Sequence, residues 1–129
     1  DAWAKAVEND SDFSEDLILP LLAERLITHY DAVDCITDGR YNAALFMRKA
    51  ANQYPEHKLL FEQAANYFMK VYELHARFFE VIGGFERGET QMRNFAKPDV
   101  RMKTGQIIRQ AKVYDEKAFA IMKQLAEVL

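Results

Sequence analysis

Two adjacent apolar stripes with helical spacing run along residues 60–82, and they constrain the fold more than any other feature. Each stripe advances by alternating steps of four and three residues, and the second repeats the first one position further round. The stripes are Leu60, Ala64, Tyr67, Val71, Leu74, Phe78 and Val81, and Phe61, Ala65, Phe68, Tyr72, His75, Phe79 and Ile82. Two such stripes make a face wide enough to be buried by more than one neighbouring helix. The pattern predicts an all-α fold with a core that includes Phe68, Val71, Leu74 and Phe78.

The other long segments also show only helical periodicity. Asp38-Gly39 and Gly83-Gly84 are stop signals, and Pro98 precedes a third uninterrupted seam. We expect one domain over residues 1–129, an up-down antiparallel helical bundle with four main helices. The expected main helices are 14–38, 40–54, 55–82 and 99–128. The second of these is expected to bury Tyr41, Ala44, Leu45, Met47 and Ala51.

Shorter elements are expected around these helices. Residues 2–8 form a candidate short helix that begins near Trp3, and residues 91–95 form a candidate helical turn. Ser14 is the expected N-cap of the helix at 14–38. The carboxylates of Glu15 and Asp16 would interact favourably with the positive, N-terminal end of the dipole of this helix.

Composition limits the class of protein. A chain of 129 residues is long enough for one domain with its own core. The single cysteine, Cys35, excludes an intrachain disulfide and favours a reducing, cytoplasmic compartment. No apolar run approaches the ~20 residues that span a bilayer, so we expect no membrane segment. The chain begins at Asp1 rather than methionine, and we expect it to be a piece of a longer protein.

Charge is spread unevenly along the chain. Residues 1–38 hold ten acidic and two basic residues, whereas the remainder holds 15 basic and 10 acidic residues. One interpretation is that the acidic first helix packs beside basic ones, so that the charges offset each other within the fold. The alternative is a basic patch at 93–112 for phosphate-bearing ligands or nucleic acid. Because Phe95 is the only aromatic residue there that could stack on a base, we expect no nucleic-acid partner.

The sequence lacks the motifs of metal and cofactor chemistry. No histidine has a glutamate three residues before it, as di-iron bundles require, and no two histidines are four residues apart. There is no Cys-x-x-Cys pair, no Gly-rich phosphate loop and no nucleophile elbow. Acids close to Cys35 disfavour its thiolate. We therefore expect no metal, no cofactor and no catalytic residue.

Two histidines interrupt otherwise apolar seams. His29 lies among leucines of the first long helix, and His75 lies in the aromatic stripe of the third. In one interpretation each is a core or boundary residue whose ring nitrogens are satisfied by Tyr30, Tyr72 or a helix carbonyl. In the other, both point into one polar pocket between the first and third helices. The candidate ligand-binding residues are then His29, His75, Tyr72, Tyr30 and Cys35.

Three classes of function remain open. The first is a non-catalytic ligand-binding or regulatory module that holds a small molecule in a polar and aromatic pocket between helices. The second is a structural or protein–protein interaction domain with a filled core. For this class the narrow heptad stripe of 100–128 and the aromatic surplus predict a homodimer or contact with a neighbouring domain. The third is an enzyme that uses the histidines.

Overall fold

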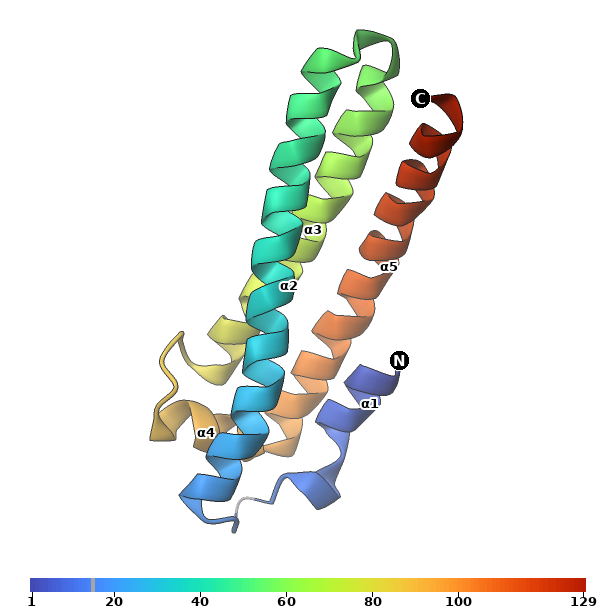
Figure 1. Cartoon of the computed structure of the whole chain (residues 1–129). Helices are drawn as coiled ribbons and strands as arrows, with labels where there is room; N and C mark the ends of the chain where they lie inside the picture. Colours follow the sequence, from blue (N-terminus) through green and yellow to red (C-terminus); the bar gives the residue numbers. More distant parts are fainter. Residues whose placement is uncertain (15) are drawn as a thin grey trace.

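The protein is an all-α bundle in which three long helices run up, down and up (Figure 1). A computed structural model describes residues 1–14 and 16–129, and this part of the chain contains no strand. The central long helix, α3, packs against both α2 and α5. The prediction of an antiparallel helical bundle is confirmed. Its elements are α1 (Ala2–Glu8), the 3-10 helix η1 (Asp10–Asp12), α2 (Leu19–Gln53), η2 (Pro55–His57), α3 (Lys58–Ile82), α4 (Glu89–Ala96) and α5 (Pro98–Val128).

The two helices expected at 14–38 and 40–54 are one continuous helix, α2, which has 35 residues. Gly39 stays helical, since only Gly83 and Gly84 have positive φ among the described residues. A glycine inside a helix costs only about 1 kcal/mol relative to alanine, which packing along α3 offsets. The protein therefore has three long helices and two shorter ones rather than four main helices.

The continuity of α2 also decides which of its residues face the core. Ala44, Met47 and Ala51 are buried, as predicted. Tyr41 and Leu45 were expected in the core but are 42% and 43% exposed. Each of the two follows an inward-facing position by one residue, which turns its side chain toward solvent.

The start of α2 lies later than predicted. The helix begins at Leu19 with Pro20 in its first turn, where the missing N–H of proline costs no hydrogen bond. Ser14 is not the N-cap; its Oγ accepts a hydrogen bond from the Asp16 backbone N–H at 3.2 Å. Glu15, expected in the first helical turn, lies outside the described residues.

The helix α3 ends at the glycine pair, as predicted, and its end forms a Schellman motif. Gly83 has φ +99°, and the Gly84 N–H donates to the Phe79 carbonyl at 2.8 Å. The side-chain amides of Gln91 and Asn94 donate to other carbonyls of this terminus at 3.0 and 3.1 Å. The predicted turn at 91–95 thus exists as α4, which caps the end of α3.

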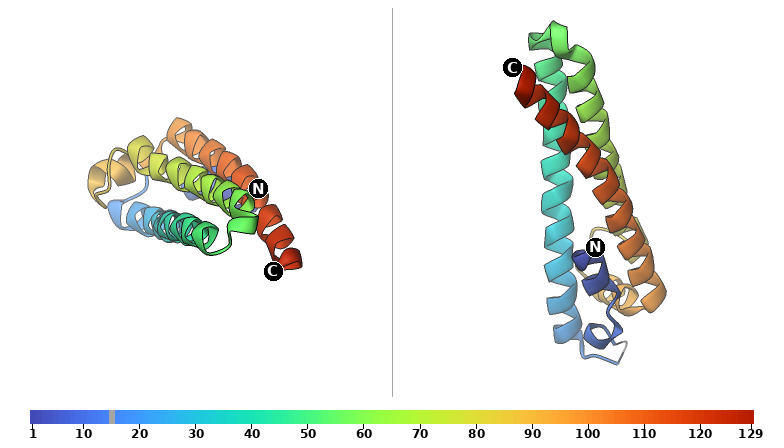
Figure 2. Two further views of the ribbon diagram at one scale, coloured as in Figure 1. Left: turned by 90° about the horizontal axis from the view of Figure 1, so that it is seen from above. Right: turned by 90° about the vertical axis from the view of Figure 1, so that its right-hand side faces the viewer.

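The short helix α1, confirmed at 2–8, lies between the lower parts of α2 and α5 and leaves their upper parts uncovered (Figures 1 and 2). Its Ala4 and Val7 are fully buried. Glu8 forms a two-bonded ion pair with Arg109 of α5, at 2.5 and 2.6 Å. A Cβ at Gly105 would lie 2.0 Å from the Glu8 carboxylate, so this mid-helix glycine makes room for α1 against α5.

The core is divided into a lower and an upper cluster along the bundle axis. The lower cluster joins α1, α2, α3, α4 and α5 around Phe78, and the upper joins α2, α3 and α5 around Phe68. Phe68, Val71 and Phe78 are 2%, 1% and 0% exposed, as predicted. Leu74 is only half-buried, which corrects its assignment to the deep core, because it lies at the edge of the α3 face beside α5.

The heptad stripe of α5 is buried within its own chain. Most of its side chains from Val100 to Leu125 are buried from solvent, whereas Val128 at its end is exposed. The stripe therefore gives no support to the predicted homodimer.

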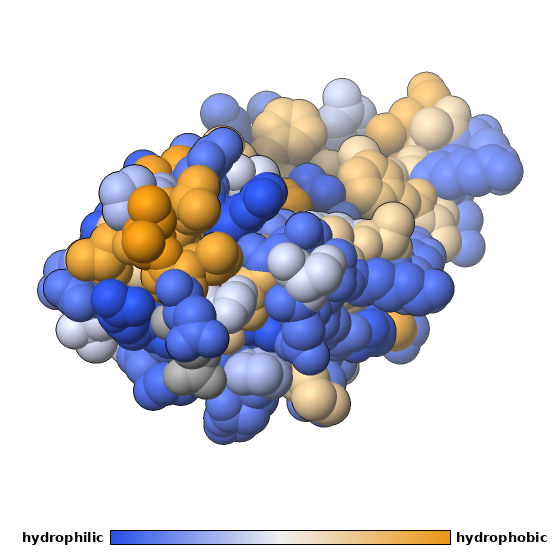
Figure 3. Space-filling model, turned by 90° about the horizontal axis from the view of Figure 1, so that it is seen from below, coloured by the Kyte–Doolittle hydropathy of each residue, from blue (hydrophilic) through white to orange (hydrophobic). Residues whose placement is uncertain are grey.

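Apolar side chains also reach the surface of the bundle. Its lower end carries an apolar patch among hydrophilic residues (Figure 3), and Ile18 and Leu21 at the start of α2 are 65% and 42% exposed. None of the described helices combines the length and apolarity needed to cross a bilayer.

Because Leu74 is only half-buried, its truncation should lower the free energy of unfolding less than truncation of a fully buried residue. We expect Phe78→Ala to lower the free energy of unfolding by about 3–5 kcal/mol, the usual cost of removing a buried phenylalanine ring. Leu74→Ala should cost clearly less, because its side chain already contacts solvent. Leu59→Ala, at an 81% exposed position, is the control. Urea denaturation measures all three, and equal losses for Phe78→Ala and Leu74→Ala would contradict the packing described.

Candidate functional site

Trp3 of α1 lies between the two histidines that the sequence singled out. Its indole Nε1–H donates a hydrogen bond to His29 Nδ1 at 3.1 Å. Its ring stacks on His75, with centroids 5.8 Å apart and planes 13° apart. The structure thus brings His29 and His75 to one place, but a side chain of the protein occupies the space between them.

His29 is held as a neutral acceptor in this cluster. Its ring packs against Phe13 and Phe95, each at a centroid distance of 5.7 Å. Burial lowers the pKa of His29 and outweighs the opposing charge of Asp12. The Trp3 hydrogen bond needs an unprotonated Nδ1, so docking of α1 and the neutral ring favour each other.

His75 is the more deeply buried of the two, at 4% exposed. Its Nδ1 has no hydrogen-bond partner among the described residues. Burial lowers its pKa to about 4, assisted by Arg40 and opposed by Asp115. The ring lines a small cavity of about 200 Å³ together with Trp3 and Asp115.

The other sequence candidates do not join this cluster. The buried Tyr30 hydroxyl donates to the Phe85 carbonyl at 2.6 Å, and Arg87 lies over the Tyr30 ring. The Tyr72 ring packs against Tyr41 at 5.2 Å. Cys35 is exposed on α2. Of the five candidate residues, only the two histidines share a neighbour in Trp3.

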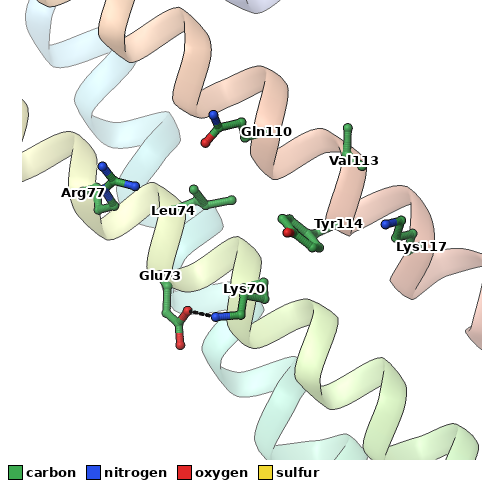
Figure 4. A pocket seen from close by; sticks show the side chains of 8 residues that line it. All are labelled: Lys70, Glu73, Leu74, Arg77, Gln110, Val113, Tyr114 and Lys117. Atoms are coloured by element: carbon green, nitrogen blue, oxygen red, sulfur yellow. Dashed lines mark hydrogen bonds and ion pairs between the residues drawn. The ribbon is translucent and has the colours of Figure 1, made fainter.

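A groove of about 590 Å³ lies between α3 and α5 (Figure 4). A volume of this size is in the usual range for small-molecule sites. Sequence reasoning did not find it, because its residues come from two antiparallel helices whose register the sequence does not show. The groove is lined by Lys70, Glu73, Leu74 and Arg77 of α3 and by Gln110, Val113, Tyr114 and Lys117 of α5.

Positive charge dominates the lining of the α3/α5 groove. Lys70 is paired with Glu73 at 2.8 Å, and this hydrogen bond raises the pKa of Lys70. Lys117 Nζ lies 5.4 Å from the centroid of the Tyr114 ring. Neither Arg77 nor Lys117 pairs with a carboxylate of the described residues. Two cations are thus available to an anion.

Metal ligands are not clustered in the described part of the chain, where no three His, Cys, Asp or Glu side chains come together to hold an ion. No family model, curated protein or solved structure matches the chain significantly. The geometry of the chain itself therefore carries the functional argument.

The burial of His75 should make stability depend on pH. Its pKa is about 4 in the folded chain and 6.5 without burial, so between these values the unfolded chain binds more protons. Stability is therefore complete above the higher pKa and falls as pH drops toward the lower one. The loss should reach about 3 kcal/mol from this residue.

The test is urea denaturation across that pH range, with Trp3 emission as a second readout. His75→Gln should remove most of the pH dependence, whereas His57→Gln, at a position outside the cluster, should retain it. A wild-type protein whose stability is flat across the range would contradict the buried neutral state of His75.

Proposed function

We propose that the protein is a non-catalytic binding module whose α3/α5 groove takes an elongated organic anion. The observation that carries this proposal is the arrangement of charges around an apolar centre. The lining holds no serine, cysteine or histidine, and its one carboxylate, that of Glu73, is already paired with Lys70, which supports binding rather than catalysis.

The two ends of the groove carry its charges. Arg77 and Gln110 are at one end, and Lys70 and Lys117 are at the other (Figure 4). Lys70 and Arg77 are seven residues apart on α3, which corresponds to about 10 Å along a helix. The matching ligand has anionic groups at both ends, separated by about that distance.

The middle of the groove is apolar. Leu74 and Val113 lie there, beside the ring of Tyr114. Val113 is 48% exposed and would lose apolar surface to water on binding. An aliphatic or aromatic body between two carboxylates fits both the charges and this centre.

The expected affinity is modest. Solvent-exposed ion pairs contribute about 0.2–1 kcal/mol each, so most of the affinity comes from the apolar centre. A dissociation constant of about 1 mM corresponds to about 4 kcal/mol, which such a site can supply.

An NMR titration with sebacate, a long-chain dicarboxylate, tests the proposal. Amide shifts should saturate and concentrate in residues 70–77 and 110–117. Decanoate, which has the same length and one carboxylate, should bind about 1.4- to 5-fold more weakly, because one charged end loses its partner.

Two variants should change the affinity for sebacate in opposite directions. Arg77→Gln should weaken sebacate binding and reduce its advantage over decanoate. Glu73→Gln should strengthen binding, since it removes a carboxylate that competes for Lys70. Arg93→Gln, on α4 and paired with Glu89, is the control. Equal binding by Arg77→Gln and wild type, or shifts spread over the whole chain, would contradict the proposal.

A further inference from the structure

A second groove lies between the upper parts of α2 and α5 and has a volume of about 390 Å³. Unlike the α3/α5 groove, it exposes an almost wholly apolar surface, although Arg40 and Asn42 also border it. Phe68 of α3 contributes to it from the upper core cluster. The other main lining side chains are Ala43, Phe46 and Met47 of α2, and Phe119 and Met122 of α5.

Two aromatic side chains in this groove are poorly covered. Phe46 is 64% exposed and Phe119 is 51% exposed. The Arg40 guanidinium lies 5.5 Å from the centroid of Phe119 and covers part of that ring only. Exposed apolar side chains that gather at one groove are typical of a surface that binds another molecule, whereas single exposed apolar residues are common on any protein.

The groove lies on the face that α1 covers lower down. The Trp3 cavity and the upper groove meet at the ion pair between Arg40 and Asp115, which joins α2 to α5 at 2.6 Å. Below this pair the face is closed by a helix of the chain itself. Above it, no described residue covers the groove, since α1 lies only beside the lower parts of α2 and α5 (Figure 2).

The charges beside the groove indicate the partner's chemistry. Residues 39–53 of α2 contain three basic residues and no acidic one. Lys49 lies one turn beyond Phe46, and Lys123 lies one turn beyond Phe119. Because α2 and α5 both run upward (Figure 1), each lysine follows the groove-lining residues of its own helix in the upward direction.

We propose that the upper α2/α5 groove binds an amphipathic helix of a partner protein, with acidic residues in the first turn of that helix. The helix lies along the groove between α2 and α5, with its first turn at the upper end. Its apolar face covers Phe46 and Phe119, a recurring mode of helix recognition. Its acidic first turn faces Lys49 and Lys123 and also suits the dipole of its own N-terminus.

A second copy of this chain suits the groove less well. Symmetric packing of two such grooves would bring the basic stretches 39–53 of both copies together, and like charges at an interface are costly. The homodimer predicted from the sequence is thus the competing occupant, and the test includes it. The proposal is independent of anion binding, since the α3/α5 groove lies on a different face of α5.

The test uses two stapled, fluorescein-labelled helical peptides with the same leucine face. One carries glutamates in its first turn, and the other carries lysines at the same positions. Fluorescence anisotropy should show saturable binding of the glutamate peptide and at least about tenfold weaker binding of the lysine peptide. Phe46→Ala should weaken binding of the glutamate peptide about tenfold, as expected for the loss of a central aromatic contact. Leu59→Ala, at an exposed position outside the groove, should not.

Charge reversal distinguishes specific recognition of the acidic peptide from nonspecific hydrophobic binding. The double variant Lys49→Glu with Lys123→Glu should reverse the preference between the two peptides. Retained preference for the glutamate peptide would overturn the proposal, as would no saturable binding up to about 1 mM. Light scattering should return about 15.0 kDa for the free protein. A dimer mass that Phe46→Ala reduces to the monomer would assign the groove to a second copy and also overturn the proposal.

Discussion

The contact of Trp3 with both His29 and His75 decides which surfaces of this bundle are closed and which remain open. A single side chain from α1 reaches one residue on each of two long helices, through a hydrogen bond and a stacked ring. Because α1 is only seven residues long, it has little stability of its own and depends on this tertiary packing. Its docking closes the lower part of the face between α2 and α5.

Ion pairs hold the acidic beginning of the chain on the basic later helices. Glu8 pairs with Arg109, Asp31 with Arg87, and the Asp10 carboxylate bonds the buried guanidinium of Arg101, which also donates to the Ala96 carbonyl. These pairs support the interpretation that the uneven charge of the sequence offsets within the fold. Arg109 also lowers the pKa of Glu8 through their hydrogen bonds. Several basic residues form no ion pair within the described part of the chain. Among them, Arg77 and Lys117 have a role in the proposed anion site, and Lys49 and Lys123 have a role in the proposed helix-binding groove.

Sequence periodicity predicts most of this fold but little of its sites. The stripes of 60–82 and 100–125 define α3 and α5, and the two glycines define the end of α3, because these are local signals. The break expected at Gly39 was wrong, since tertiary packing outweighs a weak local preference. The placement of His29 and His75 on one face was foreseeable, yet Trp3 between them was not, because contacts across 26 residues carry no local pattern. The α3/α5 groove depends on helix register for the same reason.

The closed lower face of the bundle depends on the docking of α1, and Trp3 reports this docking directly because it is the only tryptophan. The most direct measurement is the NMR signal of its indole Nε1–H in the free protein near neutral pH. The account predicts one signal with slow solvent exchange and cross-relaxation to the rings of both His29 and His75. An indole proton that exchanges as fast as in a free peptide, without contacts to either ring, would show that α1 leaves the lower face open and would contradict the account.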